Sequence, residues 1–211
     1  MQHQTIKVVK IQPTTEMLSI TWMLGSRCNY DCMYCPDDIH DNTSAHPDLV
    51  KLKTAWHSIY EKTKHQNLPY KIGFTGGEVT ANKSFLPIIE YLQSGEFSIG
   101  ELYVSTNGSA SLNYYKKLVK LVNGITFSTH SEFFNEQDFF QKALEINQLM
   151  IRPEKSFHVN VMDEFWNKDR TIKYCELLTK NNVSHTLHQV DYSMQIRLTP
   201  KSEGKLNLEF I

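Results

Sequence analysis

The sequence is poor in cysteine, in long apolar runs and in excess charge of either sign. Three of its 4 cysteines fall between positions 28 and 35, which excludes a disulfide framework of the kind that small secreted domains use. No apolar run approaches the roughly 20 residues of a membrane-spanning helix. Residues 1–7 lack the apolar core of a signal peptide. We therefore expect a cytoplasmic protein without a membrane partner.

The charges nearly balance, because 22 basic and 23 acidic residues give a formal net charge of −1. This provides no electrostatic basis for nucleic acid as a partner, and it leaves nucleotide-sized ligands open. The length of 211 residues, with 40% hydrophobic residues, suits one large core. No repeat or Pro/Gly/Ser-rich linker divides the chain. We predict a single domain over residues 1–211, with 1–16 as an N-terminal extension and 191–211 as a short C-terminal tail.

Strand-like and helix-like segments alternate along the chain. The expected strands are Leu18–Leu24, Tyr70–Thr75, Glu101–Thr106, Ile125–Thr129, Phe157–Met162 and Ser184–Val190. The expected helices are Asp48–Lys62, Phe85–Leu92, Tyr114–Val122, Glu136–Met150 and Arg170–Lys180. This alternation predicts an α/β fold of mostly parallel β/α units, and six units form a partial (β/α)6 barrel rather than a full eight-stranded one. In the tail, the alternation of Leu206, Leu208 and Phe210 favours a short edge strand.

Alternate residues of the expected strands are polar. Ser105 and Asn107 share one face of their strand, as do Ser128 and His130 on the next and His158 and Asn160 on the one after. Strands buried on both faces would be almost continuously apolar. The pattern therefore predicts a barrel interior that is polar enough to hold a ligand. An open antiparallel sheet with one wet face is the alternative.

The cysteines Cys28, Cys32 and Cys35 have the spacing CxxxCxxC. Closely spaced thiolates bind soft metal centres, including iron–sulfur clusters. A closed structural zinc site has four ligands, so three cysteines favour a centre that keeps one position open for chemistry. Two alternatives remain open here: the cysteines are small buried apolar residues, or they form a zinc knuckle whose fourth ligand is His40 or His46.

A second motif, Gly76-Gly77-Glu78, follows the second expected strand, and Tyr34 directly precedes the last cysteine of the first motif. CxxxCxxC with this aromatic residue, followed by GGE at the next strand end, resembles the radical S-adenosylmethionine (SAM) superfamily. The resemblance runs from Leu18 to Val190. It departs from the family pattern at Val79, where proline is usual.

The resemblance implies a radical-SAM-type partial barrel with one [4Fe–4S] cluster, held by the three cysteines, whose fourth iron binds SAM. Reductive cleavage of SAM then gives a 5′-deoxyadenosyl radical, which abstracts a hydrogen atom from a small-molecule or peptide substrate. The electron comes from a donor such as flavodoxin or ferredoxin. No further cysteine group follows Cys35 to hold an auxiliary cluster. Two alternatives are an activase that makes a glycyl radical on a partner enzyme and a non-catalytic zinc-binding interaction module.

The resemblance also suggests roles for individual residues. Backbone groups of Gly76 and Gly77 would hold the SAM ammonium group, with Glu78 fixing the segment. The other candidate SAM-binding residues are Tyr34, Ser105, Asn107, Ser128, Asn160 and Gln189. His130 is the candidate catalytic residue, as a substrate ligand or proton donor. The competing interpretations are that Gly76-Gly77 and Asn107-Gly108 are plain turns and that His130 is structural.

Overall fold

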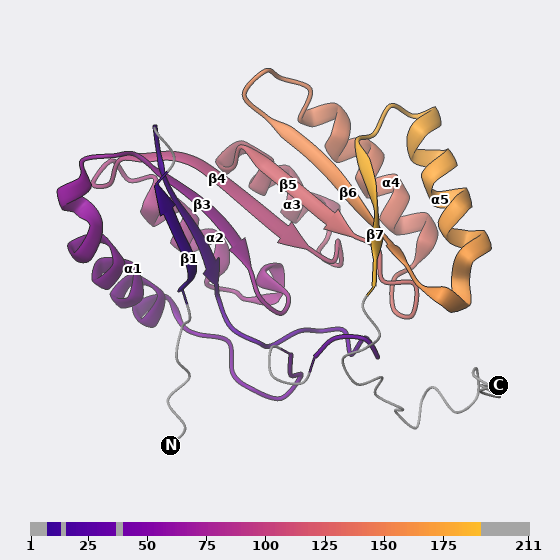
Figure 1. The fold of residues 1–211 in the computed structure, drawn as a ribbon, viewed down its shortest axis with the longest axis horizontal. Helices are drawn as coiled ribbons and strands as arrows, with labels where there is room; N and C mark the ends of the chain where they lie inside the picture. Colours follow the sequence, from indigo (N-terminus) through magenta and orange to yellow (C-terminus); the bar gives the residue numbers. More distant parts are fainter. Residues whose placement is uncertain (1–7, 14–15, 37–39, 191–211) are drawn as a thin grey trace.

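In the described part of the chain, the strands form one seven-stranded sheet in which they are ordered as they occur in the sequence (Figure 1). The computed structural model describes residues 8–13, 16–36 and 40–190. The strands are β1 (Val8–Pro13), β2 (Leu18–Met23), β3 (Tyr70–Thr75), β4 (Ile99–Thr106), β5 (Gly124–Ser128), β6 (Ser156–Asp163) and β7 (His185–Gln189). Strands β2 to β7 are parallel, and β1 pairs antiparallel with β2. The predicted α/β fold with mostly parallel strands is confirmed.

Strand β1 was not predicted, and it lies inside the segment expected to be an N-terminal extension. It pairs with β2 from Val8, opposite Trp22, to Pro13, opposite Leu18. The edge strand expected around Leu206 to Phe210 lies outside the described residues. The single-domain boundaries over 1–211 stay a prediction.

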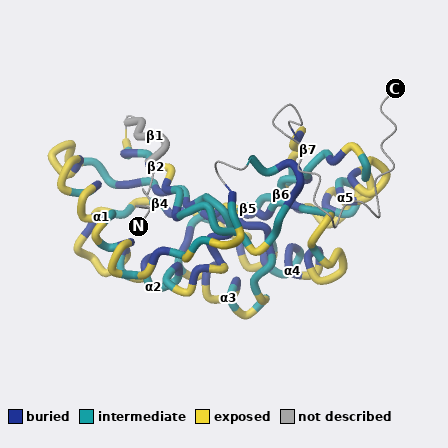
Figure 2. The backbone as a smooth tube through the Cα atoms, turned by 90° about the horizontal axis from the view of Figure 1, so that it is seen from below, coloured by how far each residue is buried: buried dark blue, intermediate teal, exposed yellow. Residues whose placement is uncertain are grey.

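The helices lie together on the outer, convex side of the sheet (Figure 2). They are α1 (Leu49–Thr63), α2 (Phe85–Leu92), α3 (Leu112–Leu121), α4 (Glu136–Leu149) and α5 (Lys168–Lys180), with short 3-10 helices at η1 (Lys64–Gln66), η2 (Val79–Ala81) and η3 (Phe165–Asn167). Side chains of Asp48, Ser111 and Asn135 accept backbone N–H bonds at the starts of α1, α3 and α4. Within the described residues, no helix combines the length and apolar character that crossing a membrane requires.

The core lies between the sheet and the helices. The strand side chains that face the helices are fully or almost fully buried: Leu18, Ile20, Trp22, Ile72, Phe74, Leu102, Val104, Ile125, Phe127, Phe157, Val159 and Val161. Trp22 stacks on Trp56 of α1 with ring centroids 5.9 Å apart. On the other face, Ser105 is exposed, and Ser128 and Asn160 are half-buried. The predicted division of the strands into an apolar face toward the helices and a polar face is therefore correct. The parallel pairing rules out the alternative of an open antiparallel sheet.

The parallel pairing places the functional loops at one edge of the sheet. Met23 at the end of β2 pairs with Thr75 at the end of β3, and Ser128 at the end of β5 pairs with Asn160 of β6. The segments that follow these strands carry the cysteines, the GGE motif and His130. The carboxyl ends of parallel strands are where ligands bind in open α/β sheets.

Candidate functional site

The segment that leads from β2 to the first cysteine lies directly against the end of β3. The N–H of Gly77 donates to the carbonyl of Gly25 (2.8 Å), and the N–H of Glu78 donates to the carbonyl of Arg27 (2.9 Å). A Cβ atom added to Gly77 would lie 2.1 Å from the Arg27 carbonyl oxygen. A Cβ on Gly76, whose φ is +127°, would lie 2.4 Å from the Gly25 carbonyl oxygen. The glycine pair is therefore required by a close approach of two backbones.

Glu78 is a buried carboxylate that joins the ends of β3 and β4. Its Oε1 accepts bonds from the N–H and the hydroxyl of Thr80 (2.9 and 2.5 Å) and from the Thr106 hydroxyl (2.7 Å). Its Oε2 accepts from the N–H of Asn107 (2.7 Å). Burial raises the pKa of Glu78, and these hydrogen bonds oppose the rise. With both oxygens occupied by donors, Glu78 acts as a fixed anchor beneath the loop.

Asn107 extends this anchor to the first cysteine. Its side-chain amide donates to Oδ1 of Asn29 (2.9 Å) and lies 3.9 Å from Sγ of Cys28. The Asn29 amide in turn donates to the Ser109 hydroxyl (3.0 Å). Burial is the main reason that the pKa of the Cys28 thiol is raised. The sequence predicted Asn107 as a SAM contact, and the structure places it between Glu78 and Cys28.

The second cysteine belongs to another polar group, which the structure assembles from the loops after β2, β5 and β6. Sγ of Cys32 lies 3.5 Å from Nδ1 of His130, and the Tyr34 hydroxyl lies 2.5 Å from the same nitrogen. The Tyr34 hydroxyl also donates to Oε1 of Glu164 (3.2 Å), which is 1% exposed. The rings of Tyr34 and His130 stack with centroids 6.0 Å apart. His130 therefore contacts the cysteine loop.

Burial governs the charge state of this group. It lowers the pKa of His130 to about 4, so the imidazole is neutral near pH 7. It also raises the pKa of the Cys32 thiol and of Glu164. Glu132, whose carboxylate accepts the N–H of Met33 (3.3 Å), has its pKa raised to about 7, mainly by burial. Burial thus works against the charged form of each of these groups.

The three cysteines fit an iron–sulfur cluster in their chemistry and in their place on the fold. All three are free thiols on one loop at the carboxyl edge of the sheet, and the N–H of Cys35 donates to the carbonyl of Cys32 (3.0 Å). Thiolates are the ligands that such clusters use. In the part of the chain that the structure describes, no three His, Cys, Asp or Glu side chains are gathered closely enough to hold a metal ion. The ligand set therefore stays a prediction.

His40, one candidate for the fourth ligand of a zinc knuckle, points elsewhere. Its Nε2 lies 2.7 Å from the Tyr30 carbonyl oxygen, and its Nδ1 lies 3.9 Å from Oδ1 of Asp31. It is 4% exposed. These contacts engage both ring nitrogens with groups other than the cysteine sulfurs. They speak against His40 as a zinc ligand.

The remaining predicted SAM-binding residues lie along the open face. Ser105 lies opposite Thr126 on β5, and Ser128 lies opposite Asn160 on β6. Gln189 pairs with Asp163, and the preceding residues Met162 and His188 pair with each other. Because strand side chains alternate, Gln189 shares the helix-facing side of the sheet with Leu187 and is not brought together with Asn160.

Sequence reasoning missed Asn29 and Glu164. Glu164 follows β6 at the carboxyl edge, and Asn29 directly follows the first cysteine. Their positions at strand ends and in the cysteine loop were available signals. Their partners Asn107 and Tyr34 are 78 and 130 residues away in the chain, so only the folded structure shows the contacts.

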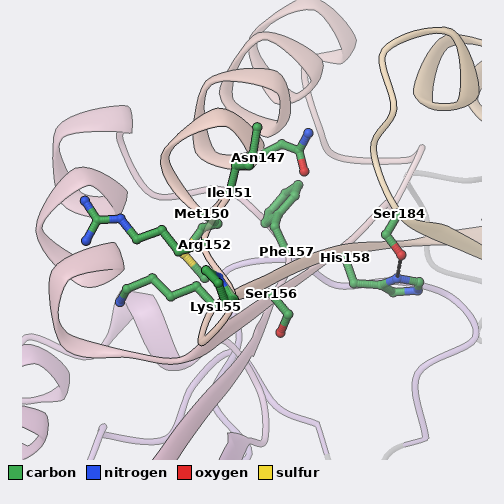
Figure 3. A pocket seen from close by; sticks show the side chains of 10 residues that line it. Asn147, Met150, Ile151, Arg152, Lys155, Ser156, Phe157, His158 and Ser184 are labelled. Carbon is green, nitrogen blue, oxygen red and sulfur yellow. Dashed lines mark hydrogen bonds between the residues drawn. The ribbon is translucent and has the colours of Figure 1, made fainter.

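A separate pocket of about 530 Å³ lies at the opposite edge of the sheet (Figure 3). It is lined by the turn between α4 and β6, including Arg152 and Lys155, and by His158, whose Nδ1 lies 2.9 Å from the Ser184 hydroxyl. Ser156, which also lines the pocket, is the first residue of β6. The pocket is therefore at the amino ends of the strands and is not part of the candidate site.

Comparison with known proteins gives a sequence relative and structural neighbours. Over 91 residues the chain is 35% identical to the GTP 3′,8-cyclase of Haemophilus influenzae (strain PittEE), a match that covers 43% of this chain and 25% of that protein. SuiB of Streptococcus suis superposes with a TM-score of 0.60 at 15% identity, over 86% of this chain and 42% of SuiB, which shows a shared fold. BtrN in complex with AdoMet and 2-DOIA gives a TM-score of 0.41 at 15% identity, over 66% of this chain and 67% of BtrN, too low to support an inference. No protein-family model matches the chain.

Proposed function

We propose that this chain is a radical SAM enzyme, which binds one [4Fe–4S] cluster through Cys28, Cys32 and Cys35 and cleaves SAM to abstract a hydrogen atom from a small-molecule or peptide substrate. The chain spans a quarter of the length of its curated relative and less than half of SuiB. The likeness to these proteins therefore supports the type of chemistry that we propose, and it leaves the substrate open.

One observation carries the proposal. The loop with all three cysteines is bonded to the Gly76-Gly77-Glu78 segment at the carboxyl edge of a parallel sheet, through the pairs Gly77–Gly25 and Glu78–Arg27. Two motifs that are 41 residues apart, counted from Cys35 to Gly76, thus form one structural unit. A plain strand-to-helix turn requires no such unit, whereas a cofactor shared by both segments does.

When bound, the cluster and SAM supply a one-electron reductive cleavage and a carbon radical that is strong enough to remove hydrogen from carbon. The chain's own residues position these groups. Glu78 accepts a hydrogen bond from the N–H of Asn107, whose side-chain amide donates to Asn29 in the cysteine loop. Tyr34 is 8% exposed, and its ring contacts the rings of His130 and Trp166. Cys32 itself is 6% exposed, so little of its surface is open to water.

The substrate would bind on the open face, beyond the strand ends. Ser105, Ser128 and Asn160 present polar side chains there and are the proposed contacts to SAM. His130, although predicted as catalytic, has Nδ1 directed at Tyr34 and Cys32, so we assign it to the cysteine loop rather than to the substrate. The reductant would be a flavodoxin or ferredoxin, and the compartment the cytoplasm.

Anaerobic incubation with SAM and a chemical reductant tests the proposal. After reconstitution with iron and sulfide, the chain should release methionine and 5′-deoxyadenosine. The variant Cys32→Ala should release neither, whereas Cys175→Ala, a cysteine on α5, should behave like the wild type. Equal SAM cleavage by the wild type and Cys32→Ala would refute the ligand assignment.

A further inference from the structure

The pocket at the amino edge of the sheet has three chemically different parts (Figure 3). The side chains of Arg152 and Lys155 form a positively charged part, and they extend to the same side in this view. The middle is apolar, and His158 and Ser184 lie at the opposite end. With a volume of about 530 Å³, the pocket has room for a small organic molecule.

Two cations lie close together at the charged end. The ammonium group of Lys155 donates to the carbonyl oxygens of Val119 (2.6 Å) and Val122 (2.7 Å), which fixes it at the end of α3. An ammonium group has three donors, so one remains for a ligand. Burial is the main reason that the pKa of Lys155 is lowered; Glu154 opposes this shift, and the positive charge of Arg152 adds to it. An anion bound beside both cations would relieve their repulsion.

Arg152 provides further donors to such an anion. It is exposed, and its side chain makes no hydrogen bond or ion pair with the part of the chain that the structure describes. The guanidinium group has five N–H donors in a planar fork, which matches the oxygens of a carboxylate or phosphate group. Residues 150–155 contain two basic side chains and one acidic side chain, so this turn has an excess of one positive charge.

The rest of the pocket suits the body of an organic ligand. Met150 and Phe157 line its buried side at 3% and 5% exposure, and Ile151 borders it at 73% exposure. A ligand that covers Ile151 removes apolar surface from water. At the far end, Nδ1 of His158 lies 2.9 Å from the Ser184 hydroxyl. This contact leaves Nε2 of the imidazole for a polar group of the ligand.

We propose that this pocket is a second ligand site, which binds a small organic anion. Its carboxylate or phosphate group would lie beside Arg152 and Lys155, its apolar body against Ile151, and a polar group at His158. The pocket lies at the edge of the sheet opposite to the cysteine loop. The proposal is therefore independent of the proposed SAM chemistry.

Isothermal titration calorimetry on the 211-residue chain tests the site, with phenyl phosphate and benzoate as probes. The wild type should bind at least one of them saturably, with one molecule per chain, and the tighter of the two identifies the preferred anionic group. That probe should bind more tightly than phenol, which lacks the anion, and more tightly than inorganic phosphate or acetate, which lack the ring. Arg152→Gln should weaken its binding by about tenfold, because a charge-assisted bidentate contact is lost.

The matched control is Arg170→Gln, which removes an exposed arginine on α5 outside the pocket and should leave the affinity unchanged. Ile151→Ser should weaken the aromatic probe and leave the binding of the inorganic anion or acetate unchanged. Both Arg152 and Ile151 are exposed, so neither substitution disturbs the core. The proposal is overturned if neither probe binds saturably, or if Arg152→Gln and Arg170→Gln bind with equal affinity.

The role of the far end is measured with the 4-hydroxy derivative of the tighter probe. Its added hydroxyl can bond to the imidazole of His158, so it should bind the wild type more tightly than the parent compound. His158→Phe should remove this preference and retain the binding of the parent compound. A preference that persists in His158→Phe would refute the assignment of His158 to the ligand.

Discussion

The substitution Gly77→Ala tests the close approach between the GGE segment and the cysteine loop. The added Cβ would lie 2.1 Å from the carbonyl oxygen of Arg27, 2.3 Å from its carbonyl carbon and 2.6 Å from the carbonyl oxygen of Ser26. All three are backbone atoms, which no side-chain rotation can move away. The loop must therefore shift, and the bonds from Gly77 to Gly25 and from Glu78 to Arg27 must lengthen or break.

The expected cost follows from these two effects. Each lost backbone hydrogen bond costs about 0.5–1.5 kcal/mol, and the overpacking costs about 1–3 kcal/mol, which gives a loss of about 2–6 kcal/mol in the free energy of unfolding. For a chain of this size, each kcal/mol lowers the Tm by roughly 2–4 °C. If the loop shifts without unfolding the domain, part of this loss appears as weaker iron binding.

Gly73→Ala is the matched control, because Gly73 lies in the same strand and its added Cβ would meet only the Ile20 carbonyl oxygen, at 3.9 Å. It should stay within about 1 kcal/mol of the wild type, since alanine is favoured over glycine in a strand. Urea unfolding followed by circular dichroism gives the stability of each variant, and colorimetric iron analysis gives its iron content. The close-packing argument is refuted if both glycine variants match in denaturation midpoint and in iron content.

Further predictions concern the anchor beneath the loop and the cysteines. In Glu78→Gln, the new amide donor faces groups that already donate, so the free energy of unfolding from urea denaturation should fall by about 1–3 kcal/mol. A denaturation midpoint equal to that of the wild type would contradict the role of Glu78 as an anchor. Asn107→Ala removes the amide beside Cys28 and should increase the rate at which a chelator removes iron, with little change in secondary structure by circular dichroism. Cys32→Ala should lose the bound iron in elemental analysis, while Cys175→Ala should keep it; equal iron in both would contradict the ligand set.

The fold was predictable because its signals are local. Apolar residues at helical spacing and alternating residues in strands reflect burial against one core, and Ser105, Ser128 and Asn160 were correctly placed on the open face. Strand β1 was missed because an antiparallel edge strand depends on its pairing with β2, which residues 8–13 do not reveal. The side of the sheet that Gln189 occupies was not predictable, because polar residues on the exposed last strand obscure the alternation, and its contact with SAM stays a prediction.

The candidate site was predictable only in part. The two motifs located the three cysteines and the Gly76-Gly77-Glu78 segment, because the residues of each motif lie close together in the chain. The role of His130 depends on the Tyr34 hydroxyl 96 residues away, and that of Glu164 depends on the same group. Such contacts arise when loops after different parallel strands meet at one edge, and no spacing in the sequence encodes them.

Metal analysis of the anaerobically reconstituted chain tests the central claim most directly. A brown protein with about four irons and four sulfides per chain, whose reduced cluster changes its electron paramagnetic resonance spectrum when SAM is added, is the predicted result. A colourless protein that binds one zinc ion per chain and no iron would contradict it.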